Sequence, residues 1–351
     1  MATIKISRNI LPLTAVIISL LCIFKMPDAV TQGVTAGLGI CFNVILPSLF
    51  PFMVLSAYIV KSEALRFLYK LFYPLTRFIL RQPLCTVPVV IMGLIGGFPV
   101  GAKMTFLLLE KGQITKNQAQ RLCMFCVNGG PAFVITAVGV NMLGNSRAGV
   151  ILFASLCISS LILGFATSFF DDKKALEIHI ENSAQSPLVA LSASVTDGVQ
   201  SILGICAWVV LFSGITECLK STGISDEAYM SLVSVLEVTK GCTLIAGKMG
   251  IPVLATVIGF GGFCVHCQIF SYIKATGLKY SHFFVGRVLC AAISAVICHL
   301  LLLVFPVDIT TAVMDKDITA SAFSVSLPAF IALTIMCIVM IFDIDSKKKI
   351  C

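Results

Sequence analysis

Apolar residues dominate most of this chain, in runs long enough to form membrane-spanning helices. A transmembrane helix needs roughly 20 consecutive apolar residues. The runs fall at about 10–24, 33–60, 122–143, 148–170, 197–219, 251–273, 284–306 and 323–342. The pattern therefore predicts an all-α polytopic membrane protein.

Two further apolar stretches are interrupted by glycine and lysine, at residues 96–103 in the first half and 236–241 in the second. A broken backbone at membrane depth is tolerated only where protein or a water-filled cavity surrounds it. Paired breaks in two halves are typical of secondary transporters built from inverted repeats. We interpret the stretches as re-entrant hairpins at about 84–109 and 228–248.

A polar stretch at 171–196 divides the chain into two repeats and predicts a cytoplasmic linker. The first repeat, 29–170, contains a glycine-interrupted span at 122–143. The second, 197–306, contains one at 251–273. Each repeat has the same order of elements: a span, a hairpin, a broken helix and a further span.

Three segments lie outside this repeated order. The N-terminal run within 1–28 could be a signal peptide, but no small-residue cleavage site follows it, so we expect a retained anchor span. Residues 307–351 predict a C-terminal span and a basic tail. Residues 62–81 place basic side chains on one face and apolar ones on the other, which predicts an amphipathic helix in the cytoplasmic interface, kinked near Pro74.

Composition and charge agree with the membrane class. The chain is 58% hydrophobic and 12% charged, and its mean hydropathy is +1.01. The net charge of +8 does not indicate nucleic-acid binding, because the basic residues sit in short loops beside apolar runs. Assigning these loops to the cytoplasm places both termini inside. The same assignment predicts that the two hairpins enter the membrane from opposite faces. The lipid bilayer is an expected partner of the protein.

Charged residues inside a membrane are costly, and each is a functional hypothesis by default. Lys103, Glu237 and Lys240 lie in the interrupted stretches, and Glu217 lies near the end of a span. Glu237 and Lys240 are three residues apart, so they can pair on a helical turn. That pairing and a role in binding a substrate or ion are equally open. For Lys103 the alternative is snorkelling to the cytoplasmic face.

The first break suggests an anion site. Its glycines let the backbone reverse, which leaves amide N–H groups and a helix N-terminus pointing at one place. A neutral ligand would use Asn128, Thr239 and Gln268 instead, and Glu237 is the candidate proton carrier if transport is ion-coupled. The candidate substrate-binding residues are Gly97, Phe98, Pro99, Gly101, Lys103, Asn128, Gly129, Gly130, Glu237, Thr239, Lys240 and Gln268.

No cofactor or metal is expected. Most of the 15 cysteines lie inside apolar runs, where they behave as small hydrophobic residues. The segment from Cys264 to Cys267 is the one cluster that could bind a metal or do thiol chemistry. It offers three ligands at most and has no second cluster at zinc-ligand spacing.

Three motifs carry a resemblance to a known family: Gly-Phe-Pro-x-Gly-Ala-Lys at 97–103, Asn-Gly-Gly-Pro at 128–131 and Glu-Val-Thr-x-Gly at 237–241. The chain resembles the sporulation integral membrane proteins of the YlbJ type, in the nucleoside-recognition (Gate) domain superfamily, over about 30–305. The resemblance implies a fold similar to that of concentrative nucleoside transporters, with two re-entrant hairpins and two broken helices.

The resemblance also implies a function, because members of this type are implicated in moving dipicolinic acid across the outer forespore membrane. We therefore expect a secondary transporter of a small organic anion in a bacterial cell membrane, working by alternating access. Lys103 and Lys240 would face the carboxylates.

Other functions stay open. One alternative is transport of a nucleoside or another neutral solute, although the chain lacks a clear match to the motifs that hold ribose and sodium in the nucleoside transporters. Another is a non-transporting protein of a sporulation membrane complex. An enzyme is least expected, because no nucleophile–base pair is visible. A homo-oligomer is possible.

Overall fold

The computed structural model describes residues 20, 24–62, 68–170 and 186–307. Every regular element in these ranges is helical. Four described helices are long and apolar enough to cross a membrane, and six spans result if each of two bent helix pairs is one span. The predicted all-α membrane class is confirmed. Three predicted segments fall mainly outside the described residues: the anchor span within 1–28, the linker and the C-terminal span.

The first half follows the predicted order. A bent span comes first, formed by α2 (Pro27–Ile40), η1 (Cys41–Ile45) and α3 (Leu46–Ser62), and it is followed by two short helices, α4 (Leu68–Pro74) and η2 (Leu75–Ile79). The hairpin is formed by η3 (Leu84–Thr86), α5 (Val87–Ile95) and α6 (Phe98–Glu110). The broken helix is formed by α7 (Lys116–Phe125) and η4 (Ala132–Met142), and the last span is α8 (Ser146–Thr167), extended by η5 (Ser168–Phe170).

The second half repeats that order without the two short helices. It consists of the span α9 (Pro187–Ser221), a hairpin of α10 (Asp226–Leu236) and α11 (Val238–Ile245), a broken helix of α12 (Ile251–Phe260) and α13 (Gly262–Thr276), and the span α14 (Tyr280–Val304). α9 begins at Pro187 rather than at the predicted 197, because proline is well suited to the first turn of a helix. The linker is correspondingly shorter than predicted.

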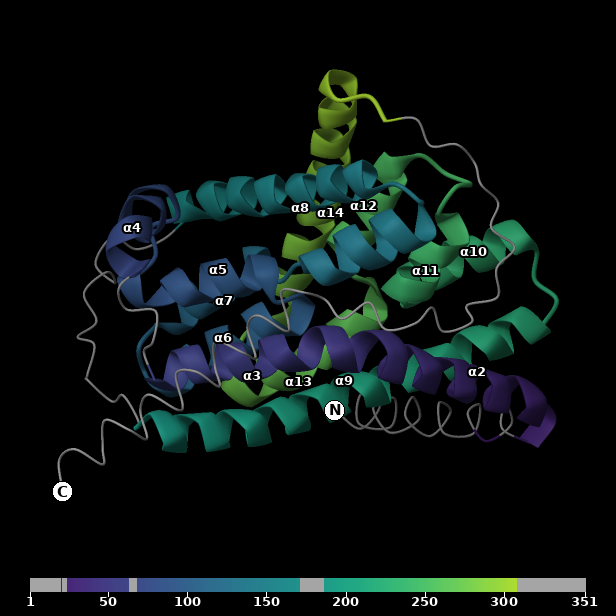
Figure 1. The fold of residues 1–351 in the computed structure, drawn as a ribbon, viewed down its shortest axis with the longest axis horizontal. Coiled ribbons are helices and arrows are strands. Elements are labelled where there is room, and N and C mark those ends of the chain that lie inside the picture. The colour runs from purple at the N-terminus through teal and green to yellow at the C-terminus, as the bar shows by residue number, and fades with distance from the viewer. Residues whose placement is uncertain (1–19, 21–23, 63–67, 171–185, 308–351) are drawn as a thin grey trace, which may run out of the picture.

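The first spans of the two halves lie side by side and run antiparallel (Figure 1). Glycines bring their backbones close together. A β-carbon on Gly33 would lie 2.7 Å from the Cα of Gly214, and one on Gly198 would lie 2.7 Å from a methyl group of Val54. Gly33 and Gly37 form the small-residue spacing that favours close helix packing in membranes. The N-terminal part of α2 thus contacts the C-terminal part of α9, and α3 contacts the N-terminal part of α9.

The last spans of the two halves also meet. The hydroxyl of Ser159 on α8 lies 3.3 Å from the thiol of Cys290 on α14. α14 stands steeply across α8 in Figure 1. α12 packs on α14, where a β-carbon on Gly259 would lie 2.6 Å from the hydroxyl of Ser294. Small residues therefore set the helix contacts in the second half as well.

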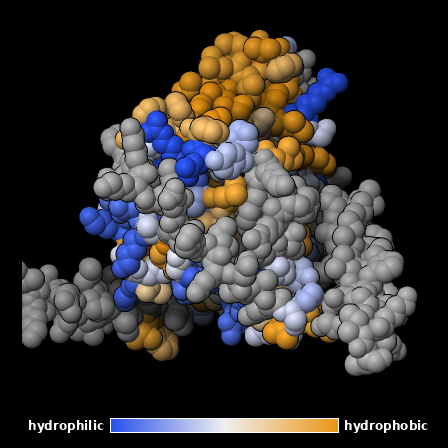
Figure 2. Space-filling view, turned by 90° about the vertical axis from the view of Figure 1, so that its left-hand side faces the viewer, coloured by the Kyte–Doolittle hydropathy of each residue, from blue (hydrophilic) through white to orange (hydrophobic). Residues whose placement is uncertain are grey.

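Two basic loops that the charge pattern assigned to the same side lie next to each other. The side-chain amide of Gln120 donates to the carbonyl of Lys279 at 2.8 Å, and Gly277 lies beside the Lys116 amine. The side chains of Lys111, Lys116, Lys274 and Lys279 are exposed. The view of the molecule from the end where α4 lies shows hydrophilic residues beside a broad apolar surface (Figure 2).

The segment predicted as an interfacial helix forms α4 and η2 in its described part, with the change of helix type directly after Pro74. The axis bends by 112° before residues 84–95. Leu71 and Phe78 are 70% and 69% exposed. Such exposure of large apolar side chains suits contact with lipid, although the structure holds no membrane.

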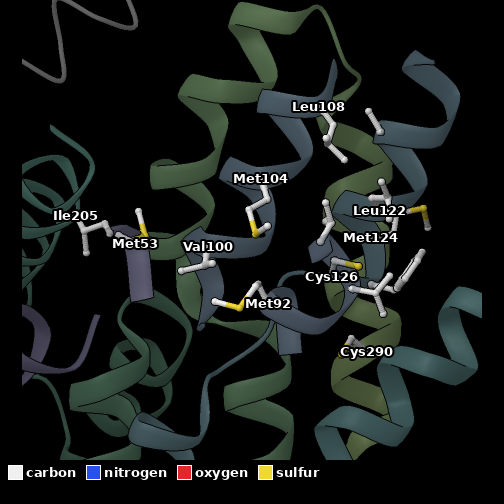
Figure 3. Packing of buried hydrophobic residues seen from close by; sticks show 14 of the residues in the cluster. Met53, Met92, Val100, Met104, Leu108, Leu122, Met124, Cys126, Ile205 and Cys290 are labelled. Atoms are coloured by element: carbon white, nitrogen blue, oxygen red, sulfur yellow. The ribbon is translucent and has the colours of Figure 1, made fainter. Parts of the chain in front are cut away.

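The first hairpin is wedged against the first broken helix. The carbonyl oxygen of Cys126 lies between Gly93 on α5 and Gly101 on α6, and a β-carbon on Gly101 would come within 1.7 Å of it. Met92, Val100 and other apolar side chains of the hairpin line the surrounding core (Figure 3). Because the obstacle is backbone, it cannot move aside cheaply.

Gly101→Ala is therefore expected to destabilise the protein by about 2 kcal/mol or more, as overpacking does. Alanine would otherwise favour the helix by about 1 kcal/mol over glycine. Gly204→Ala on α9 is the matched control, because a β-carbon there meets nothing within 4 Å. Melting temperatures in detergent should fall for Gly101→Ala and hold or rise for Gly204→Ala. Equal melting of the two variants would contradict the packing described.

Candidate functional site

The four breaks in the helices converge on one region. They are the tips of the two hairpins, at 96–97 and at Glu237, and the interruptions of the two broken helices, at 126–130 and at Gly261. These positions are far apart in the sequence. Each break contacts at least one other, as the following distances show.

The tip of the first hairpin rests on the first broken helix. Gly97 has a φ of 92°, which favours glycine, and it allows the chain to reverse between α5 and α6. A β-carbon on Gly130 would lie 2.9 Å from the nitrogen of Gly97 and 2.8 Å from the carbonyl oxygen of Ile95. The Asn-Gly-Gly-Pro motif therefore leaves room for the hairpin tip.

The tip of the second hairpin rests on the second broken helix in the same way. Gly261 and Gly262 have φ values of 87° and 73°, and this pair separates α12 from α13. A β-carbon on Gly262 would lie 3.0 Å from the nitrogen of Val238 and 3.2 Å from the carbonyl oxygen of Leu236. Glycine at this break leaves room for the second hairpin tip.

Phe98 joins the two pairs. Its ring approaches Gly261 to 3.2 Å and Gly129 to 3.5 Å, measured to the β-carbon that each glycine would carry. Phe98 is 8% exposed. The first hairpin thus contacts both broken helices, and we call the region of Gly97, Phe98, Gly129, Gly130, Glu237, Gly261 and Gly262 the central junction.

Four helix N-termini begin at the central junction. α6, η4 and α13 start without a side chain that accepts from their first N–H groups. α11 is capped by Glu237, whose carboxylate oxygens accept from the backbone N–H groups of Thr239 at 3.0 Å and Lys240 at 2.6 Å. Helix N-termini carry partial positive charge. The N-terminus of α11 therefore already binds a carboxylate. The N-termini of α6, η4 and α13 have no such cap, so their partial positive charge can favour an anion at the central junction.

Lys103 points away from the central junction, towards the early part of α9. Its amine donates to the carbonyl oxygen of Asp197 at 2.7 Å and to the hydroxyl of Ser201 at 2.5 Å. The Asp197 carboxylate pairs with Lys61 at 2.8 Å. Lys103 is 6% exposed, so in this conformation its amine is held inside the protein and does not take up the snorkelling arrangement, which was the alternative to a role in binding.

Lys240 points towards the late part of α9. Its amine lies 2.7 Å from a carboxylate oxygen of Glu217 and donates to the hydroxyl of Thr216 at 3.2 Å. The ion pair between Glu237 and Lys240, which the sequence left open, is not formed. The reason is local: Glu237 turns back to cap α11, and only the backbone N–H of Lys240 reaches it.

The two lysines do not converge. Ser201 and Thr216 are 15 residues apart on one continuous helix, which corresponds to about 22 Å at 1.5 Å per residue. One small dicarboxylate cannot touch both amines in this conformation. A role of either lysine in binding stays a prediction, but the joint role expected from the sequence needs a different conformation.

The remaining predicted residues lie near the central junction or just outside it. Asn128 is buried, and its amide donates to the carbonyl of Phe125 at 2.9 Å. Pro99 is buried in the first turn of α6. The Gln268 amide lies 3.4 Å from the Cys264 sulfur. Within the described ranges, no group of three or more His, Cys, Asp or Glu residues could hold a metal.

Two groups of polar residues were missed from the sequence. Asp197 and Ser201 share one face of α9, at a spacing of four residues that could have flagged them. Arg287 stands near the start of the apolar run at 284–306 and was not named as a candidate, yet it is the eighth residue of α14 and is fully buried. Its guanidinium donates to the carbonyl of Val127, next to the first break.

The apolar helices and the buried junction of broken helices define a multi-pass α-helical membrane protein. The chain is 26% identical over 342 residues to the sporulation integral membrane protein YlbJ of Bacillus subtilis (strain 168), an alignment that covers 85% of this chain and 82% of the relative. The similarity confirms the resemblance to YlbJ-type proteins that the motifs indicate. No family model and no solved structure matches the chain.

The contact between Lys240 and Glu217 can be tested with a double-mutant cycle. Lys240→Met leaves a half-buried carboxylate without its hydrogen-bonded partner, and we expect a loss of about 2 kcal/mol. Adding Glu217→Gln should restore part of that loss, because the two residues are coupled. Thermal melting in detergent measures both.

Lys220→Met is the matched control. Lys220 is 66% exposed, and its amine lies 3.9 Å from Glu217, so its removal should change stability by less than about 0.5 kcal/mol. If Lys240→Met and Lys220→Met have the same melting temperature, the contact between Lys240 and Glu217 does not stabilise the fold, and this would contradict the role described for Lys240.

Proposed function

We propose that this protein is a secondary transporter of a small organic anion, with its binding site at the central junction. Dipicolinate is the cargo that the family resemblance implies. The observation that supports the proposal most is the meeting of four helix N-termini around Phe98, three without a side-chain cap and one capped by a carboxylate. Broken helices with their N-termini directed at one point are typical of anionic substrate sites in transporters.

The arrangement of the halves supports alternating access. The first spans run antiparallel, and each hairpin is tied to a different part of α9, through Lys103 to Asp197 in one case and through Lys240 to Glu217 in the other. Hairpins that approach a common centre from opposite ends are what inverted repeats require. On this proposal, one hairpin opens to one side of the membrane while the other stays closed.

The lysines then act on the hairpins rather than on the cargo. Each amine holds its hairpin to α9 through polar contacts that can break and reform. A contact of this kind favours the closed position of a gate without fixing it permanently, since a pair of charged hydrogen bonds is worth about 3 kcal/mol.

A second candidate is a non-transporting protein of a membrane complex. The observation that favours it is the burial of Phe98, whose ring occupies the space between the two broken helices. A transporter would have to move this ring during its cycle, whereas a scaffold would keep it in place.

Uptake of radiolabelled pyridine-2,6-dicarboxylate into proteoliposomes tests the proposal. Wild-type protein should take up the label above the level of empty liposomes, and unlabelled dicarboxylate should compete better than uridine. Preferential competition by uridine would select a nucleoside transporter. Absence of both uptake and exchange would favour the scaffold.

Glu237→Gln tests whether Glu237 carries the coupling proton. Glutamine keeps one oxygen that can accept from the N–H groups in the first turn of α11, but it cannot bind and release a proton. We expect uptake driven by a proton gradient to fall to background, while exchange of labelled for unlabelled dicarboxylate continues. Equal loss of both activities would instead mean that Glu237 is needed to hold the second hairpin.

A further inference from the structure

Arg287 is a buried charge without a counter-ion among the described residues. It lies on α14 and is 0% exposed. The ion pairs that the structure shows in the described part join Lys61 to Asp197, and Lys220 and Lys240 to Glu217, so none includes Arg287. A buried cation is normally paired, because water has been removed from around it.

One edge of its guanidinium group is free. Nη1 donates to the carbonyl of Val127, while Nε and Nη2 are buried and have no hydrogen-bond partner in the described structure. Nε–H and Nη2–H point in the same direction on one side of the planar group. That pair of parallel donors matches the two oxygens of a carboxylate.

Among the described residues, no carboxylate pairs with this edge. His266 and Cys126 are titratable groups near Arg287. The imidazole of His266 is held by the Tyr280 hydroxyl at 2.9 Å and by the Phe260 carbonyl at 3.3 Å. These groups are an imidazole ring and a thiol, and neither replaces a carboxylate.

The edge lies next to the central junction. Val127, which accepts from Nη1, immediately precedes the Asn-Gly-Gly-Pro break, and Gly129 lies against Phe98. A carboxylate that reached the junction from the open side of a hairpin would find this edge beside the free N-termini. Movement of the first hairpin, which packs on Cys126, would give access.

We infer that Arg287 is the residue that binds a carboxylate of the transported anion, through a two-point contact with Nε and Nη2. The inference rests on the proposed transport function and names the anchor of the same site. It assigns to one arginine the role that the sequence gave to the two lysines.

Binding of pyridine-2,6-dicarboxylate to purified protein, measured by calorimetry, tests the inference. Arg287→Lys keeps the charge but lacks the two parallel donors, so its Kd should rise at least about 10-fold. Arg121→Lys is the matched control. That arginine is also buried, but it donates to the backbone carbonyls of Leu80 and Arg81, so affinity should stay near wild type.

Arg287→Met separates a binding role from a structural one. Methionine fills a similar volume without an uncompensated charge, so the variant should melt at or above the wild-type temperature and bind no dicarboxylate. A lower melting temperature with wild-type affinity would show that Arg287 only caps the carbonyl end of α7, and would overturn the inference.

These experiments also distinguish a failure of the proposed transport function from a failure of the role assigned to Arg287. Wild-type protein that neither binds nor transports the dicarboxylate would refute the proposed function, and the inference with it. Wild-type protein that transports, together with Arg287→Lys of unchanged affinity, would leave the function standing and refute only the role of Arg287.

Discussion

The structure depends on one constraint: backbone groups freed by a break in a helix must be satisfied or shielded when lipid surrounds the protein. The described part of this chain has four such breaks, and each lies against another break rather than towards the outside. Glycine makes the contacts possible, since a β-carbon at Gly101, Gly130 or Gly262 would collide with, or press against, a neighbouring backbone. The breaks therefore stabilise one another, and the same contact creates the central junction.

The distribution of charge follows from this arrangement. The charged side chains of the two hairpins each have a distinct partner. Glu237 caps the helix that follows it, Lys240 reaches Glu217, and Lys103 reaches the backbone of α9. Arg287 differs, because two of its donors have no partner in the described structure. A site that must bind and release an anion needs such an incompletely satisfied cation, since a fully paired one has nothing left to offer.

Much of the fold can be predicted from the sequence, because membrane helices and their breaks are local patterns. The glycine and proline positions mark where the described helices are interrupted, at 96–97, 126–130 and 261, whereas the start of α9 at Pro187 differs from the predicted 197. The partners of the charges were not predictable in this way. Lys103 meets residues 94 and 98 positions later in the chain, and such pairings arise only from packing. The burial of Arg287 was not predicted, because an arginine near the start of an apolar run has the same sequence pattern whether its side chain faces water or protein.

An experimental structure of the wild-type protein in a lipid nanodisc with pyridine-2,6-dicarboxylate tests most directly whether the four breaks form one anion site. We predict that Phe98, Gly129 and Gly261 lie together, with one carboxylate of the ligand beside Nε and Nη2 of Arg287. A ligand bound between Lys103 and Lys240, or hairpin tips that do not meet, would contradict it.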